Sequence, residues 1–96
     1  MTLTATEGHA DHGYHVPRPN RDAELVRWEP ATAAEDRRRV LRWTCRCRSE
    51  VYYLVSAGGR GYIERRRVGE ANVQTARMRH AEVADLWERI LLGQAR

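Results

Sequence analysis

The chain contains no lysine and no phenylalanine, so all seventeen of its basic residues are arginine. A guanidinium group forms paired, planar contacts with phosphates and carboxylates that a lysine ammonium cannot form. A GC-rich genome, whose codons favour arginine and alanine over lysine and phenylalanine, explains the same bias without any functional cause. The composition therefore admits an anionic partner but does not require one.

The sequence also lacks long apolar runs, since no stretch reaches the roughly 18 apolar residues of a membrane-spanning helix. Its N-terminus has neither a basic start nor an apolar stretch, which argues against a signal peptide. Only two cysteines are present, Cys45 and Cys47, too few for a disulfide framework. We therefore expect a protein of the reducing cytoplasm with no membrane partner.

No set of residues for catalysis stands out. A catalytic nucleophile needs a base and an orienting group beside it, and His80 is the only histidine in the part that we expect to fold. Cys45 and Cys47 are separated by one residue, whereas zinc-binding cysteine pairs usually have two to four between them. Both thiols are therefore expected to be buried apolar groups, and the protein is not expected to be an enzyme.

Three further histidines, His9, His12 and His15, lie near the N-terminus. Neutral imidazoles at this spacing would hold a divalent metal only if the tail curled around the ion. A disordered tail that merely contains histidine is the simpler interpretation. We accordingly predict no catalytic residue, no metal site and no cofactor.

Charge is unevenly distributed along the chain. Met1–Asp36 holds three arginines against seven acidic residues, a balance of −4. Arg37–Arg67 holds ten arginines against Glu50 and Glu64, a balance of +8, and the remaining residues are neutral. A basic centre behind an acidic leader indicates an anionic partner, or a leader that folds back over the centre.

The pattern divides the chain into three parts. Residues 1–20 are rich in threonine, histidine, glycine and proline and predict a disordered tail. Residues 21–39 form an acidic leader, in which Glu24–Trp28 fits a short strand or a helical turn and Pro30–Asp36 fits a short helix or a loop. Residues 40–96 predict a domain made of a sheet and a helix.

Apolar and polar residues alternate from Val40 to Cys47 and again from Val51 to Ala57, which predicts two antiparallel strands. A loop over Arg48–Glu50 brings their apolar faces together, whereas a loop of two residues would invert one strand. The pairs that this loop predicts are Cys47 with Val51, Cys45 with Tyr53 and Trp43 with Val55. The odd-numbered residues are thus expected in the core and the even-numbered ones in solvent.

Gly58-Gly59 predicts a second hairpin, because a type I′ turn needs positive φ at both central positions. If these two glycines form the whole loop, Val55 pairs with Tyr62. If Arg60 belongs to the loop, the faces of the third strand exchange. In both cases the third strand, from Arg60 to about Val68, carries several arginines and is expected at the charged edge of the sheet.

The C-terminal part predicts an amphipathic helix, with Thr75 as a possible cap and Gly93 as the terminating residue. The apolar residues that recur at three- and four-residue spacing are Met78, Ala81, Val83, Ala84, Leu86, Trp87, Ile90 and Leu91. The predicted fold is therefore α+β, with a three-stranded or four-stranded antiparallel sheet and one helix on one face. Trp87 and Leu91 are expected to pack against Trp43, Tyr53 and Val55.

On the face away from that helix, arginines surround a tyrosine, which is typical of phosphate contacts combined with base stacking. The candidate nucleic-acid-binding residues are Arg42, Arg46, Arg48, Tyr52, Arg65 and Arg67. If Arg60 belongs to the second loop, Arg66 takes the place of Arg65 and Arg67. The sequence leaves alternatives open: a solvated face, a face masked by the leader, or a protein-interaction or homodimer surface that includes Tyr52 and Leu54.

The stretches WTCRCRSEVYYLVSAGG, at residues 43–59, and AEVADLWERILLGQAR, at residues 81–96, carry a resemblance. They resemble small arginine-rich proteins of high-GC bacteria that have no assigned activity. The resemblance covers somewhat more than half of the chain when the sequence between the stretches is included. It implies a cytoplasmic stand-alone module and transfers no functional residue. The function that we expect, a non-enzymatic regulatory module that binds nucleic acid, rests on the positive balance of Arg37–Arg67 instead.

Overall fold

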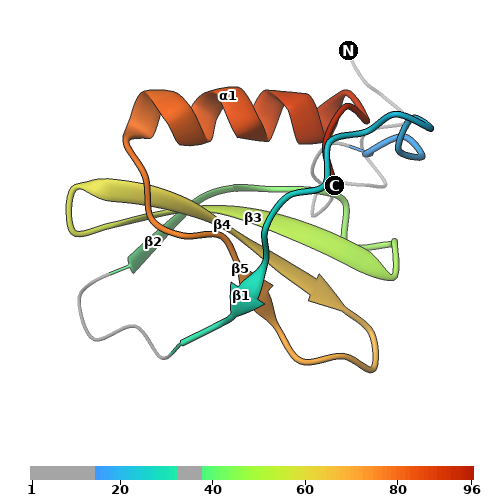
Figure 1. The fold of residues 1–96 in the computed structure, drawn as a ribbon. Helices are drawn as coiled ribbons and strands as arrows, with labels where there is room; N and C mark the ends of the chain where they lie inside the picture. Colours follow the sequence, from blue (N-terminus) through green and yellow to red (C-terminus); the bar gives the residue numbers. More distant parts are fainter. Residues whose placement is uncertain (1–14, 33–37) are drawn as a thin grey trace, which may run out of the picture.

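The computed structural model describes residues 15–32 and 38–96. Within these residues, five strands form one antiparallel sheet and a single helix lies across one of its faces (Figure 1). The elements are β1 (Glu29–Pro30), β2 (Arg38–Trp43), β3 (Glu50–Ala57), β4 (Arg60–Arg67), β5 (Val73–Gln74) and α1 (His80–Leu91), and the strand order is β1-β5-β4-β3-β2. The α+β class is confirmed, with more strands than the sequence predicted. No helix in this part of the chain is long and apolar enough to span a membrane.

The hairpin of β3 and β4 is the most regular part of the sheet. Gly58 and Gly59 have φ angles of 58° and 78°, so the two glycines alone form the turn. Val55 pairs with Tyr62, and Leu54 pairs with Ile63. The shorter of the two loops considered from the sequence is therefore the one that forms.

The hairpin of β2 and β3 has a longer loop than predicted. Trp43 pairs with Tyr53 instead of Val55, and the chain then leaves the strand for a turn. The predicted pairs of Cys45 and Cys47 are therefore wrong. The alternating sequence pattern continues past the end of β2, but the residues there form a turn, and side chains in a turn do not alternate between two faces of a sheet.

A β-bulge further alters β2. Arg42 pairs with Leu54, but beyond the bulge Val40 pairs with Val55, so one extra residue is inserted at Leu41. A bulge inverts the faces of all residues that follow it. β2 consequently has no single apolar face, and all of its residues are exposed.

Two short strands complete the sheet. β1 pairs with β5, and β5 pairs with β4, so β4 lies in the middle of the sheet and is not its charged edge. The predicted strand at Glu24–Trp28 is wrong, because β1 begins one residue after it and Glu24 forms only an isolated bridge with Ala95. Most of the predicted helix or loop at Pro30–Asp36 lies outside the described residues.

Helix α1 confirms the clearest pattern in the sequence, although it begins later than expected. The Glu82 carboxylate accepts a hydrogen bond from the backbone N–H of Arg79, the residue before the helix (3.2 Å). Gly93 has a φ of 76° just beyond the helix, as expected for a terminating glycine. Thr75 is not the cap: its hydroxyl accepts a hydrogen bond from the backbone N–H of Ile63 in β4 (3.1 Å).

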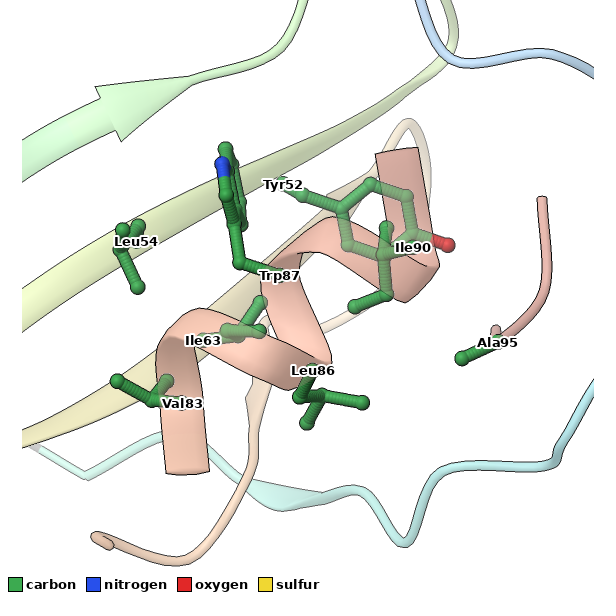
Figure 2. Packing of buried hydrophobic residues seen from close by; sticks show 8 residues of the cluster. All are labelled: Tyr52, Leu54, Ile63, Val83, Leu86, Trp87, Ile90 and Ala95. Carbon is green, nitrogen blue, oxygen red and sulfur yellow. The ribbon is translucent and has the colours of Figure 1, made fainter. Parts of the chain in front are cut away.

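The main core lies between α1 and the sheet. Figure 2 shows Trp87 and Ile90 of α1 pointing toward Tyr52 and Leu54 of β3. The buried members of this cluster are Tyr52, Leu54, Ile63, Val83, Leu86, Trp87, Ile90 and Ala95. At Gly61, a Cβ atom would come within 2.6 Å of Val83 Cγ1, so glycine allows the helix to approach β4.

The side of the sheet that carries the helix is thus opposite to the predicted one. The even-numbered residues Tyr52 and Leu54 are buried under α1. Val55, Ala57 and Tyr62 are also buried, but they form a second cluster on the other side. Both faces of β3 are therefore apolar and both are covered.

The segment before β1 runs along the C-terminal end of the chain (Figure 1). The Asn20 N–H donates to the Gly93 carbonyl (2.8 Å), and the Val26 N–H donates to the Arg96 carbonyl (2.7 Å). Val16 packs against the main core. The predicted disordered tail at residues 1–20 lies largely outside the described residues, and from residue 15 onward the chain contacts the fold.

Candidate nucleic-acid interface

We call the sheet surface turned away from α1 the outer face. Directly paired residues share a face of an antiparallel sheet, so the observed pairs of Trp43 with Tyr53 and of Tyr53 with Glu64 place these three residues in one row across β2, β3 and β4. Arg66, which pairs with Val51, lies beside this row on the same face. The outer face thus combines aromatic and charged side chains at its centre.

Guanidinium groups lie over the aromatic rings of the outer face. Arg46 lies 5.4 Å from the ring centroid of Trp43, and Arg66 lies 4.6 Å from that of Tyr53. The distances are in the range for cation–π attraction. Tyr62 is contacted in the same way by Arg38 (5.9 Å) and Arg77 (5.6 Å), and is itself almost fully buried. Arginine side chains therefore cover the second apolar cluster.

Glu64 is the acidic residue at the centre of this arrangement. Its side chain is almost fully buried and accepts hydrogen bonds from Arg38 (2.7 Å) and Arg66 (3.4 Å). The hydrogen bond with Glu64 also raises the pKa of Arg38. Because a buried carboxylate requires a cation or donors nearby, Glu64 fixes both guanidinium groups on the outer face and neutralises part of their charge.

The predicted site residues do not lie on one surface. Tyr52 and Leu54 were expected to be exposed, which is wrong: both lie in the main core, and a buried residue offers no surface to a partner. Arg65 pairs with Tyr52, and Arg67 lies on the same side of β4. The structure therefore brings Tyr52, Arg65 and Arg67 together, but on the helix side of the sheet.

On that side the arginines already have partners. Arg65 lies 4.6 Å from the ring of Trp28, and burial lowers the pKa of its guanidinium. Arg67 forms an ion pair with Glu50, which raises the pKa of Arg67. These contacts indicate a structural role for both residues.

The other three predicted arginines are exposed, and of these Arg48 lines a pocket together with Tyr52. Arg42 pairs with Leu54 and so points to the helix side, near the edge of the sheet. Arg46 and Arg48 lie in the turn after β2, and of the two only Arg46 has a described ring contact on the outer face. Arg46 is therefore the only residue of the predicted set that a described contact places on the outer face.

The sequence pattern did not indicate Trp43 and Tyr53 as site residues, and it offered Arg66 only as an alternative to Arg65 and Arg67. It assigned the two aromatic residues to the core, because they belong to the odd-numbered apolar series. The alternation contained a usable signal, because a two-residue turn at Gly58-Gly59 places Tyr53 and Arg66 on one face, whereas a three-residue turn does not. The two-residue turn was one of the two alternatives. Assigning α1 to the opposite face would then have identified the outer face.

Burial of Tyr52 has a consequence for stability at alkaline pH. Burial and the nearby Glu50 carboxylate, which accepts a hydrogen bond from the tyrosine hydroxyl (2.9 Å), raise the pKa of Tyr52. An unfolded chain loses this proton near pH 10, whereas the folded protein retains it, so the unfolded state binds fewer protons. The free energy of unfolding contributed by Tyr52 therefore falls as the pH rises above about 10.

We expect Tyr52→Phe to weaken this alkaline loss. Urea unfolding of the wild type and the variant, measured by circular dichroism at pH values from about 8 to 11, tests the expectation. The variant should start less stable, since Glu50 loses a hydrogen-bond donor, and should then decline less steeply than the wild type. Parallel declines would show that Tyr52 does not retain its proton.

Comparisons with known proteins add no further assignment. No protein-family model, no curated protein and no solved structure matches the chain.

Proposed function

We propose that the protein is a small non-enzymatic regulatory module of the cytoplasm that binds single-stranded nucleic acid through the outer face. The observation that carries the proposal is the row of Trp43 and Tyr53, with the guanidinium groups of Arg46 and Arg66 against their rings. Single-strand-binding surfaces combine arginine contacts to phosphates with aromatic rings that stack on bases. An arginine plane also stacks on bases, so ring and guanidinium act together.

The charge of the outer face supports this proposal. The observed strand register places Arg38, Arg60 and Arg66 on this face, and Arg46 and Arg77 reach it through their ring contacts. The acidic residues that the register places on the same face are Glu64, which is paired with two arginines, and Glu29, at the β1 edge. Positive charge therefore prevails over β2, β3 and β4, where the rings lie.

Fluorescence anisotropy with a labelled single-stranded oligonucleotide at several salt concentrations tests the proposal. Trp43→Ala should weaken binding about 5- to 150-fold, the effect of losing one stacked base, with little change in salt dependence. Arg46→Ala should lower the slope of log K against log salt by about 0.7, because one phosphate contact is lost. Arg27→Ala removes the same charge beside α1 and serves as the matched control. Absence of binding at low salt, or equal losses in all three variants, would refute the proposal.

A second candidate function is homodimerisation along β2. In the described part of the chain no strand lies beyond β2, and Val40, Leu41 and Trp43 are between 37% and 43% exposed there. Unpaired edge strands with apolar side chains are sites where another chain adds a strand. Light scattering should then show a dimer that Leu41→Arg dissociates and that Leu92→Arg, at the exposed end of α1, leaves intact. A monomer at all concentrations excludes this function.

A further inference from the structure

Three metal-ligating side chains from distant parts of the chain meet beside the loop between β2 and β3. The imidazole of His15 and the thiols of Cys45 and Cys47 have their ligand atoms within 4.8 Å of one another. We propose that these three residues bind one Zn²⁺ ion per chain. None of these three ligands belongs to the residues of the outer face, and the proposal does not depend on nucleic-acid binding.

The fold holds Cys45 and His15 in this position from two sides. Cys45 is fully buried and follows Thr44, whose backbone N–H donates to the Tyr52 carbonyl (3.0 Å) and whose hydroxyl accepts from the Tyr52 N–H (2.9 Å). His15 precedes Val16, which packs against the main core. Contacts formed for packing and strand pairing therefore bring a histidine and a cysteine that are 30 positions apart in the chain to one place.

The chemistry of the ligands favours zinc over hard cations. Thiolates and neutral imidazoles select zinc and other soft or borderline metals, whereas calcium and magnesium require oxygen ligands. Two thiolates neutralise the charge of one Zn²⁺ ion. The backbone N–H of Cys47 also points to Cys45 Sγ (3.3 Å), and a hydrogen bond of this kind stabilises a metal-bound thiolate.

The geometry requires one small adjustment. The two sulfur atoms are 2.6 Å apart, whereas two sulfurs bound tetrahedrally to zinc at about 2.3 Å lie roughly 3.8 Å apart. Cys47 is exposed and lies in a turn, so its side chain is able to rotate outward while the buried Cys45 stays in place. A zinc ion between the sulfurs would impose this separation.

Three protein ligands leave the fourth zinc position to water or to a small anion, as in zinc sites that remain open to a ligand. A pocket of about 240 Å³ borders Cys45, and Arg18 and Arg48 contribute to its lining. The sequence predicted no metal here because the cysteine spacing offered only two ligands. The structure supplies His15 as the third, which no spacing rule would have indicated.

Titration of the reduced, full-length, metal-free protein with Co²⁺ tests the proposal, because cobalt bound by thiolates gives sulfur-to-metal absorption. We expect one Co²⁺ per chain, displaced by one Zn²⁺, and a rise in melting temperature on adding Zn²⁺. His15→Ala should weaken binding by at least about tenfold, since even the loss of a residue that only orients a ligand costs 10–100-fold. His80→Ala is the matched control and should bind as the wild type does.

The cysteine variants complete the test. Cys47→Ser, at an exposed position, should weaken Co²⁺ binding and lower the sulfur-to-metal absorption, because only the Cys45 thiolate remains. Circular dichroism would verify that the variant is folded. Cys45→Ser replaces a buried group, and its result counts only if the variant remains folded. Unchanged affinity in His15→Ala would refute the three-ligand site. Two results would refute metal binding altogether. One is the absence of thiolate absorption in the wild type. The other is a disulfide between Cys45 and Cys47 in the protein kept under reducing conditions, which mass spectrometry would show as the loss of two hydrogens.

Discussion

Replacing Trp87 with alanine is expected to lower the free energy of unfolding by about 3–5 kcal/mol, the range for removing a large buried aromatic side chain. Trp87 is 6% exposed and packs in the main core with Tyr52 and Leu54 (Figure 2). A domain of this size has a total stability of about 5–15 kcal/mol. Urea unfolding followed by circular dichroism should therefore show a midpoint far below that of the wild type.

Trp43→Ala is the matched control, because it makes the same chemical change on the outer face. Trp43 is 37% exposed and has no place in the main core, so its loss should cost less than about 1 kcal/mol. The pair of variants also tests which of the two faces of the sheet α1 covers. If Trp43→Ala destabilised the protein as much as Trp87→Ala does, Trp43 would lie in the core, as the sequence pattern indicated.

The elements with a strong local signal could be predicted from the sequence. Apolar spacing identified α1, because a helix that covers a sheet must be apolar along one stripe. Gly58 and Gly59 identified the turn between β3 and β4, since both adopt positive φ. By contrast β1 and β5 contain two residues each, too few to show any periodicity. β5 forms because β4 offers it an edge, and β1 then pairs with β5.

The face that α1 covers could not be derived from alternation alone. In β3, apolar residues occupy both faces, because the strand is central and is buried on both sides. A pattern of period two identifies the strand but cannot choose between two apolar faces. The useful signal was Gly61: glycine inside a strand often marks the close approach of another element, and here Val83 of α1 lies against it.

The candidate interface could likewise be predicted only in part. The concentration of arginine between Arg37 and Arg67 was evident in the sequence, but the selection of arginines that share a surface depended on the turn and on the covered face. Because the face was reversed, Arg65 and Arg67 were chosen in place of Arg66. A single error in topology thus led to the choice of two structural arginines instead of an exposed one.

The arginines of the outer face are linked to stability through Glu64, which gives a second large expected effect. Replacing Arg38 and Arg66 together with alanine would remove both cations that pair with the buried Glu64 carboxylate in the described part of the chain. The cost should be about 3 kcal/mol, at the low end of the range for breaking a buried ion pair, because both arginines are partly exposed and some water would reach the site. Urea unfolding of the double variant measures this cost.

Adding Glu64→Gln to the double variant should recover much of the lost stability, because the buried charge is then removed. A triple variant no more stable than the double variant would show that the arginines act through packing rather than through charge.

Glu64→Gln alone distinguishes the role of Arg38 and Arg66 in stability from their role in binding nucleic acid. It releases their guanidinium groups from the internal carboxylate, so an oligonucleotide should bind more tightly and with a steeper salt dependence than it binds the wild type. Unchanged binding would mean that these two arginines only hold the sheet together, and the interface would then be restricted to Trp43, Tyr53 and Arg46.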